Sequence, residues 1–275
     1  MINITMPTVK LLDGTQLPVL GLGTWQYGGG STADYSRDAE SVAMLRRLIE
    51  MGYTHLDTAE SYGRNHCEEL VGQAIKHFDR SDIFITTKVS PEHLRYRDVL
   101  AALEGSLRRL DTSYVDLYLI HWPNRDIPLE DTFRGLNELL ADGRVRRVGV
   151  SNFDLPLLQQ AIALCQGPII TNQVRYNLLY REPEQNGLLA FCQREGIVLT
   201  AYSPLKDDVL KHPTVIAIAQ AHGVTPAQVA IQWLVRQPYV ITIPKSSDLA
   251  HAQENLDALA LELSADEVAR LDAIA

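Results

Sequence analysis

The strongest constraint on the fold of this chain is a regular alternation between short β-branched apolar runs and longer segments with helical periodicity. There are eight such runs, and each is followed by a helical segment. The runs are residues 19–23, 54–57, 83–88, 115–120, 145–150, 169–173, 198–201 and 240–243. Strands that alternate with helices form parallel β/α units, and eight units in 275 residues predict an α/β fold, the (β/α)8 TIM barrel.

A doubly wound open sheet is the alternative architecture. It usually has fewer strands and a glycine-rich turn directly after the first one. Here the first run leads into "GLGTWQYGGG", which contains no GxGxxG pattern and opens no helix. The barrel is therefore the preferred prediction, as a single domain over residues 1–275 without linkers.

Turn and cap residues mark the ends of several elements. "VKLLDGTQLPVL" predicts an N-terminal β-hairpin that turns at Asp13-Gly14. Residues 36–52 predict a helix that Ser36 caps and Gly52 ends. Helices are also expected over 97–110, 129–143 and 184–196.

Composition excludes several classes of protein. The net charge of −9 argues against nucleic acid and anionic membranes as partners. No apolar run reaches the roughly 18 residues of a membrane span, and the N-terminus does not resemble a signal peptide. Three scattered cysteines indicate buried thiols in a reducing cytosol, and the histidines show no metal-ligand spacing. We therefore expect a cytoplasmic protein without a metal site.

Polar or aromatic residues follow all eight predicted strands, where a barrel carries its chemistry. In chain order they are Gly23-Thr24-Trp25, Asp57 with Tyr62, Lys88, His121-Trp122, Ser151-Asn152, Gln173, Tyr202-Ser203 and Lys245-Ser246. This uniformity predicts an active site that is built across the whole mouth of the barrel.

Four of these residues have side chains that together suit proton transfer: Asp57, Tyr62, Lys88 and His121. For proton transfer near neutrality, the pKa of a tyrosine must fall from about 10 to about 7, which requires roughly 4 kcal/mol. A lysine ammonium about 4 Å away supplies a comparable energy at an effective dielectric constant near 20. An aspartate would hold that lysine charged, and a neutral histidine would donate to a carbonyl oxygen. Such a set suits carbonyl reduction by hydride.

The motifs "GYTHLDTAESYG", "LIHWP", "GVSNF" and "IPKS…EN" make the sequence resemble the aldo-keto reductases, especially their short bacterial and archaeal members. The resemblance implies a catalytic tetrad of Asp57, Tyr62, Lys88 and His121, with Tyr62 as the proton donor. It implies NADPH-dependent reduction of aldehydes and ketones, without a metal. Trp25 and Trp122, with Tyr62 and His121, would line the substrate pocket, although both tryptophans could instead be plain core residues.

The resemblance also implies contacts along an extended nicotinamide cofactor. Ser151, Asn152 and Gln173 would hold its carboxamide, and Tyr202 would stack on its ring. The full set of expected cofactor residues is Gly23, Thr24, Asp57, Ser151, Asn152, Gln173, Tyr202, Ser203, Leu205, Lys245, Ser246, Ser247, His251, Glu254 and Asn255.

Recognition of the adenosine 2′-phosphate is expected in "IPKSSDLAHAQEN". Ser246 or Ser247 would cap the next helix, whose free N–H groups favour an anion. His251 stands where many relatives have an arginine, so Lys245 supplies the fixed positive charge. We expect NADPH to be preferred, with NADH bound more weakly but usable.

Two other functions are compatible with parts of this sequence. A Schiff-base aldolase would use Lys88 as its nucleophile, but it needs a lysine of depressed pKa, which Asp57 opposes. A barrel that binds NADP as a redox sensor would show little turnover. For the leading function, a small carbonyl compound is the expected partner and a monomer is the expected state.

Overall fold

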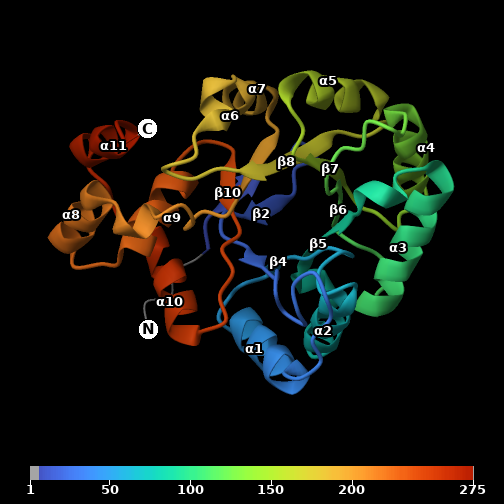
Figure 1. Ribbon diagram of the computed structural model, residues 1–275, viewed down its shortest axis with the longest axis horizontal. Coiled ribbons are helices and arrows are strands. Elements are labelled where there is room, and N and C mark those ends of the chain that lie inside the picture. The colour runs from blue at the N-terminus through green and yellow to red at the C-terminus, as the bar shows by residue number, and fades with distance from the viewer. Residues whose placement is uncertain (1–5, 275) are drawn as a thin grey trace. The chain divides into compact units, whose positions relative to one another are not determined.

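The computed structural model describes residues 6–274 and has the predicted (β/α)8 architecture. Eight parallel strands follow one another in chain order, and helices connect them (Figure 1). The strands are β3 (Leu22–Gly23), β4 (His55–Asp57), β5 (Phe84–Val89), β6 (Leu117–Ile120), β7 (Val148–Ser151), β8 (Ile169–Arg175), β9 (Val198–Tyr202) and β10 (Val240–Thr242). All eight predicted strands are confirmed, with ends that shift by a few residues.

The N-terminal hairpin is also confirmed. Strands β1 (Thr8–Lys10) and β2 (Gln16–Pro18) pair in antiparallel fashion. Gly14 lies in the turn with a φ of +88°, a conformation that glycine adopts without steric cost. Its N–H donates to the Leu11 carbonyl at 2.9 Å, which closes the turn.

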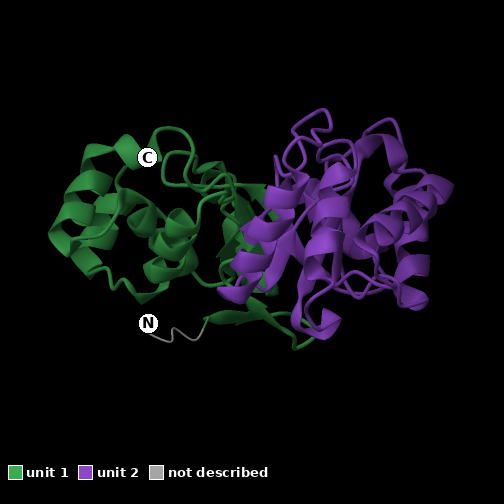
Figure 2. Ribbon diagram, turned by 90° about the horizontal axis from the view of Figure 1, so that it is seen from below, with its two compact units in different colours: residues 1–21, 173–275 green, residues 22–172 purple. Residues whose placement is uncertain are grey.

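The chain forms two compact units, shown in Figure 2. Unit 1 contains residues 6–21 and 173–274 of the described chain, and unit 2 contains residues 22–172. The single domain over residues 1–275 stays a prediction.

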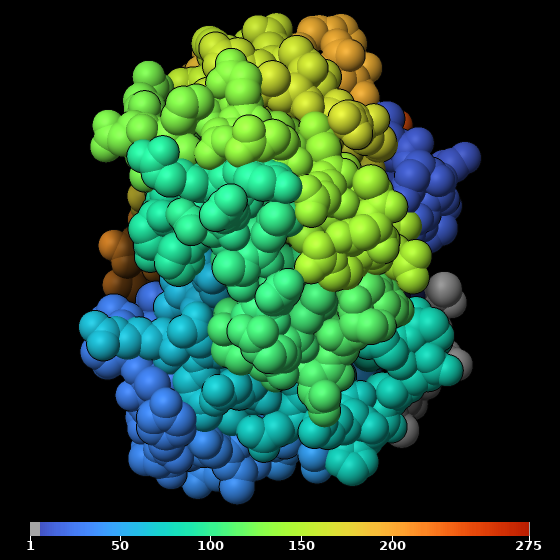
Figure 3. All heavy atoms as spheres, turned by 90° about the vertical axis from the view of Figure 1, so that its right-hand side faces the viewer, coloured from blue at the N-terminus to red at the C-terminus, as the bar shows by residue number. Residues whose placement is uncertain are grey.

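Unit 2 holds strands β3 to β7 and the helices between them. Its helices are α1 (Asp38–Glu50), α2 (His66–Ile75), α3 (Tyr96–Leu110), α4 (Leu129–Ala141) and α5 (Leu155–Leu164), with the 3-10 turns η1 (Arg80–Asp82) and η2 (Pro91–His93). Helix α3 buries Val99, Leu103 and Leu110, the apolar stripe that its sequence period predicts. Helices α3 and α4 pack against each other, and Figure 3 shows the atoms of this part of the chain in teal and green.

Unit 1 holds β9, β10 and the helices of the C-terminal part. These are α6 (Glu182–Gln185), α7 (Leu188–Glu195), α8 (Pro213–His222), α9 (Pro226–Val235), α10 (Leu249–Asp257) and α11 (Ala265–Asp272), with the 3-10 turns η3 (Val209–Lys211) and η4 (Ala258–Ala260). Strands β9 and β10 pair in parallel, with Thr200 opposite Ile241.

Two predictions about helix boundaries were wrong. The expected helix over 184–196 is broken at Gly187, which has a φ of +79°, so α6 and α7 are separate. Ser36 does not cap α1, because its hydroxyl donates to Asp34 and Arg37 takes the N-cap position. In both places a local polar or glycine conformation replaced the expected helical one. Within the described residues, no helix is long and apolar enough to cross a membrane.

Candidate active site

A buried ion pair forms the centre of the candidate site. Asp57 is the last residue of β4, and Lys88 lies near the end of β5, the neighbouring strand. The Lys88 Nζ atom lies 2.6 Å from Asp57 Oδ1, and the exposed fractions of the two side chains are 0% and 2%. Because both residues sit at carboxyl ends of adjacent parallel strands, the fold brings the two charges together on one side.

Lys88 uses all three of its N–H donors. They reach Asp57 Oδ1 at 2.6 Å, the Thr58 carbonyl at 2.7 Å and the Tyr62 hydroxyl oxygen at 3.2 Å. Burial by itself lowers the pKa of Lys88, but the Asp57 carboxylate and Tyr62 offset it, and the pKa lies above its usual value. Lys88 is therefore a charged, fully coordinated ammonium, which is unsuited to act as a nucleophilic amine.

Tyr62 lies half-buried beside this ammonium. Its hydroxyl oxygen accepts from Lys88, and the Lys88 Nζ atom lies 4.8 Å from the centre of its ring. Burial raises the pKa of Tyr62 more than Lys88 lowers it, so the pKa lies above its usual value. The expected lowering of this pKa was wrong, because desolvation of the phenolate outweighs a single ammonium. Tyr62 consequently keeps its proton at neutral pH.

His121 follows β6 and is held by its backbone. Its N–H donates to the Val89 carbonyl at 3.0 Å, and its own carbonyl accepts from Asn152 Nδ2 at 3.1 Å. Burial, together with the charge of Lys88, lowers the pKa of His121 to about 3. The imidazole is therefore neutral and carries one N–H.

Aromatic rings stand next to these groups. The ring of Trp25 meets the ring of Tyr62 edge-on, with centroids 4.9 Å apart, and Tyr62 meets His121 in the same way at 5.6 Å. Trp25 and Trp122 are 40% and 49% exposed, so the alternative that they are plain core residues was wrong. Trp25 contacts Tyr62 and Trp122 directly follows His121, and exposed aromatic rings of this kind suit the wall of a pocket.

Four of the expected cofactor residues lie in unit 2 beside the cluster. Gly23 ends β3, and the buried Thr24 donates from both its N–H and its hydroxyl to the Asp57 carbonyl. Ser151 ends β7, and Asn152 follows with a φ of +62°. The Asn152 amide donates to the His121 carbonyl and to Ser151 Oγ, so Ser151 and Asn152 are linked to His121.

Apart from Asp57, which belongs to the cluster itself, the remaining expected cofactor residues lie in unit 1. Gln173 is buried in β8, Tyr202 ends β9 half-buried, and Ser203 follows with a φ of +56°. The carbonyl of Ser203 accepts from Asn177 Nδ2 at 3.0 Å, which fixes the turn after β9. Leu205 and Glu254 are half-buried, Asn255 is buried, and Lys245, Ser247 and His251 are exposed.

The cap of α10 differs from the expectation. Asp248, and neither Ser246 nor Ser247, is the N-cap residue, and its carboxylate accepts from the N–H groups of Ala250 and His251 at 2.7 and 3.1 Å. These backbone N–H groups lower the pKa of Asp248. Ser246 instead donates from its hydroxyl to the Asp248 carbonyl. An aspartate is an equally good cap, and it places a negative charge where the sequence indicated an anion site.

Sequence reasoning missed Ser61, which directly precedes Tyr62. Its hydroxyl lies 3.3 Å from His121 Nδ1, so two consecutive residues of one turn contact the same imidazole. The sequence did contain a signal for Ser61, because it is a polar residue next to the predicted catalytic tyrosine and follows the same strand.

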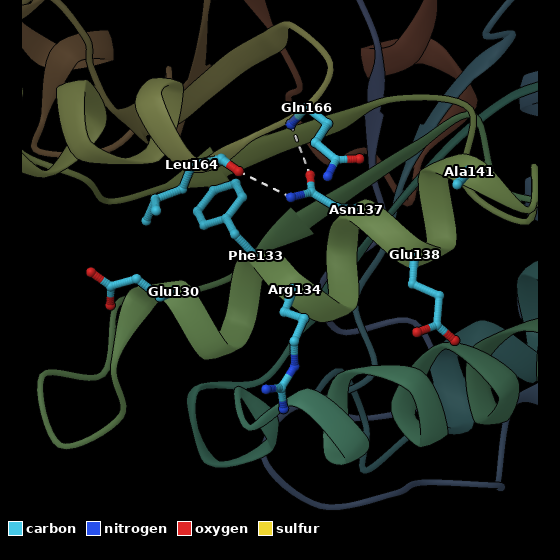
Figure 4. Close-up of a pocket in the computed structure, with 8 residues that line it drawn as sticks. All are labelled: Glu130, Phe133, Arg134, Asn137, Glu138, Ala141, Leu164 and Gln166. Carbon is cyan, nitrogen blue, oxygen red and sulfur yellow. Dashed lines mark hydrogen bonds between the residues drawn. The ribbon is translucent and has the colours of Figure 1, made fainter.

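A separate hollow of about 390 Å³ lies on unit 2 along α4 and the end of α5 (Figure 4). Asn137 spans it, with its amide bonded to the Leu164 carbonyl and to the Gln166 N–H. This hollow is lined by none of the four candidate residues Asp57, Tyr62, Lys88 and His121. Within residues 6–274, no group of three or more histidine, cysteine, aspartate or glutamate side chains is placed to hold a metal ion.

Comparison with known proteins identifies the family. The model of the Aldo/keto reductase family matches residues 19–275. The chain belongs to the aldo/keto reductase family. The resemblance seen in its sequence motifs is thereby confirmed, as is its likeness to short bacterial members.

Two curated aldo/keto reductases illustrate the relationship. Methylglyoxal reductase YeaE of Escherichia coli (strain K12) is 40% identical over 271 residues, which cover 96% of this chain and 93% of that protein. Glyoxal reductase of Bacillus subtilis (strain 168) is 38% identical over 270 residues, which cover 97% and 92%.

Solved aldo/keto reductase structures agree with the fold. The thermostable aldo-keto reductase Tm1743, in complex with the inhibitor epalrestat, has a TM-score of 0.95 at 49% identity, covering 99% of this chain and 100% of that one. An aldo-keto reductase from Klebsiella pneumoniae in complex with NADPH has a TM-score of 0.89 at 38% identity, covering 98% and 95%.

Proposed function

We propose that this protein is an NADPH-dependent reductase that converts aldehydes and ketones to alcohols. The observation that carries the proposal is the contact of one buried ammonium, Lys88, with both Asp57 and the hydroxyl of Tyr62. The family assignment supports it. The Klebsiella pneumoniae relative in complex with NADPH supports the choice of cofactor.

The residues present fit a nicotinamide dinucleotide. Ser151 and Asn152 in unit 2 and Gln173 in unit 1 offer hydroxyl and amide groups, which complement a carboxamide. Tyr202 offers a half-buried ring for stacking, and Lys245 offers a positive charge for a phosphate. We propose that these residues, together with the other cofactor residues expected from the sequence, hold the cofactor. Bound NADPH supplies the hydride.

Tyr62 supplies the proton in this mechanism. When the carbonyl carbon accepts a hydride, the C=O π electrons move to oxygen, and the resulting alkoxide is a far stronger base than a phenolate. The O–H bond of Tyr62 breaks, and its proton forms a new O–H bond with the alkoxide oxygen. The electron pair of the broken bond stays on the phenolate oxygen. The Lys88 ammonium, 3.2 Å from that oxygen, stabilises the phenolate until solvent returns the proton.

The raised pKa of Tyr62 is compatible with this role. A proton donor must carry its proton at the start of the reaction, and Tyr62 does so at neutral pH. The neutral imidazole of His121 donates its N–H to the carbonyl oxygen and orients it. Lys88 is held as an ammonium, and this argues against the Schiff-base alternative.

Small aldehydes, including α-oxoaldehydes such as methylglyoxal, are the proposed substrates. The names of the Escherichia coli and Bacillus subtilis relatives support this class. Trp25 and Trp122 offer apolar surface at the rim of the cluster for the rest of the substrate.

The test is carbonyl-dependent loss of NADPH absorbance, measured for wild type and Tyr62→Phe. We expect kcat of the variant to fall by about 10²–10⁴-fold, because the proton donor is lost. The Kd for NADPH should stay within twofold of wild type, or about 0.4 kcal/mol. Tyr96→Phe, on α3, is the matched control and should keep normal turnover. Normal turnover in Tyr62→Phe would contradict the proposed role of Tyr62 as proton donor and, with it, the proposed function. A wild-type rate several hundredfold below the usual kcat of about 10 s⁻¹ would favour the redox-sensing alternative.

We further propose a cytoplasmic monomer that folds as one barrel domain over residues 1–275 and does not bind nucleic acid. The net charge of −9 and the free cysteines Cys67, Cys165 and Cys192 support this view. Size-exclusion chromatography with light scattering tests the oligomeric state, and a mass of 30.7 kDa is expected.

A further inference from the structure

The two ring nitrogens of His121 have different surroundings. Nδ1 lies 3.3 Å from the hydroxyl of Ser61, and within residues 6–274 no protein hydrogen bond to Nε2 is found. His121 is neutral, so only one of the two nitrogens carries a hydrogen. The partner of one nitrogen in a neutral imidazole decides which nitrogen bears that hydrogen.

Ser61 is placed firmly enough to act as such a partner. It lies in the turn after β4, where its carbonyl accepts from the Arg64 N–H at 3.3 Å. The next residue, Tyr62, donates from its N–H to the Ala59 carbonyl at 3.1 Å. The backbone of His121 is fixed by Val89 and Asn152. Both ends of the contact between the hydroxyl and the imidazole are therefore anchored.

The chemistry of the contact favours one direction. An sp² imidazole nitrogen is a better hydrogen-bond acceptor than a hydroxyl oxygen, and a serine hydroxyl rotates to suit its partner. Ser61 is exposed, so its oxygen can accept from water while its hydrogen points to Nδ1. The hydroxyl donating to Nδ1 is thus the more favourable arrangement, and it leaves the imidazole hydrogen on Nε2.

We propose that Ser61 is a positioning residue that holds His121 in the tautomer with its hydrogen on Nε2, so that this nitrogen donates to the substrate carbonyl oxygen. The proposal rests on the proposed function for its catalytic meaning. The tautomer itself belongs to the protein alone and can be observed without any reaction.

The experiment is nitrogen-15 NMR of the full chain labelled at histidine, in wild type, Ser61→Ala and Ser61→Thr. His121→Gln identifies the His121 signals among those of the eight histidines. In wild type, Nε2 should give the signal of a protonated nitrogen and Nδ1 that of an unprotonated one. In Ser61→Ala the share of the Nδ1–H form should rise about fivefold, the effect of losing one neutral hydrogen bond. Ser61→Thr keeps the hydroxyl and should restore the wild-type spectrum.

Kinetics of the same variants test the consequence. For Ser61→Ala, kcat for carbonyl reduction should fall about fivefold while the Kd for NADPH stays unchanged. Ser81→Ala removes another exposed hydroxyl, beside Asp79, and should change neither the spectrum nor kcat.

The outcomes separate the two proposals. If Ser61→Ala is active and gives the same His121 spectrum as wild type, the proposed role of Ser61 is overturned, because water then replaces the hydroxyl. A wild-type spectrum with the hydrogen on Nδ1 overturns it as well. A wild type that shows no turnover on any carbonyl overturns the proposed function, and this result is read independently of the spectrum.

Discussion

Lys88 and Asp57 form an ion pair of 2.6 Å in which neither side chain is exposed to solvent by more than 2%. Such a pair is costly to desolvate and becomes stable only when both partners are present and fully hydrogen-bonded. The Thr58 carbonyl and the Tyr62 hydroxyl complete the coordination of the ammonium. The pair therefore links the stability of the fold to the proposed active site.

Asp57→Asn should destabilise the protein by about 3–5 kcal/mol, because it leaves the Lys88 ammonium buried without a counter-charge. The measurement is the free energy of unfolding from urea titration. The double variant Asp57→Asn with Lys88→Met should recover part of that loss, since the uncompensated charge is gone. Arg37→Ala breaks an exposed pair with Glu40 and should change the free energy by less than about 1 kcal/mol. A double variant less stable than Asp57→Asn would contradict this account of the pair.

Acid should destabilise the protein through its buried neutral histidines. Burial lowers the pKa of His55 to about 4 and that of His121 to about 3, whereas both titrate near 6.5 in the unfolded chain. Below pH 6.5 the unfolded chain binds protons that the folded chain does not, so stability present above pH 6.5 is lost as the pH falls toward 4.

Between pH 7 and pH 5 the expected loss is roughly 1–2 kcal/mol for each of these histidines. His55→Gln should flatten the pH dependence of the free energy of unfolding over this range. His77→Gln, in the turn after α2, is the control and should leave the slope unchanged. A slope that is equal in His55→Gln and wild type would show that His55 is not buried in its neutral form.

The carboxylate of Asp248 should weaken the preference for NADPH. It caps α10 in the segment that is proposed to hold the 2′-phosphate, and His251 is exposed on the first turn of that helix. Asp248→Asn preserves a good cap and removes the charge, so the Kd for NADPH should fall about two- to fivefold, an effect typical of exposed charges. The Kd for NADH should not change.

Cofactor fluorescence at low and high salt measures both constants, and the gain should shrink at high salt because exposed charges are screened. Asp257→Asn, at the far end of α10, is the matched control. An equal gain for NADH and NADPH would show that the carboxylate does not face the 2′-phosphate.

Gly149 should not tolerate a larger side chain. It lies in β7, where an added Cβ would come within 2.6 Å of Leu119 Cδ2 and 2.9 Å of the Thr171 carbonyl oxygen. Gly149→Ala should cost about 1–3 kcal/mol, because the neighbouring strands cannot move apart without strain. At Gly167 the added Cβ would lie 3.5 Å from Leu140, an ordinary contact. Thermal unfolding of Gly167→Ala should therefore match wild type, and equal behaviour of the two variants would refute the proposed close packing.

The sequence predicted the strand alternation and the strand ends well. Apolar runs of fixed length and glycine-bounded helices are local signals, and they do not depend on packing. Once eight parallel strands are inferred, geometry requires their carboxyl ends to meet on one side. The proximity of Asp57, Tyr62, Lys88 and His121 could thus be inferred before the structure was known.

Local signals failed where neighbouring residues compete for one position. Ser246, Ser247 and Asp248 are all good cap residues, and the path of the backbone after β10 decides that Asp248 receives the N–H groups of α10. Gly187 likewise divides a helical pattern because its backbone is left-handed. Propensity alone does not rank such neighbours.

The sequence by itself determined the fold, the family and the set of residues at the strand ends. Only the tertiary structure decided the electrostatics of the set. The direction in which the pKa of Tyr62 shifts depends on how much solvent the fold removes from the phenol. The contact of Ser61 with His121 depends on two anchored turns. Desolvation and hydrogen-bond geometry are properties of three-dimensional packing, and a one-dimensional pattern does not contain them.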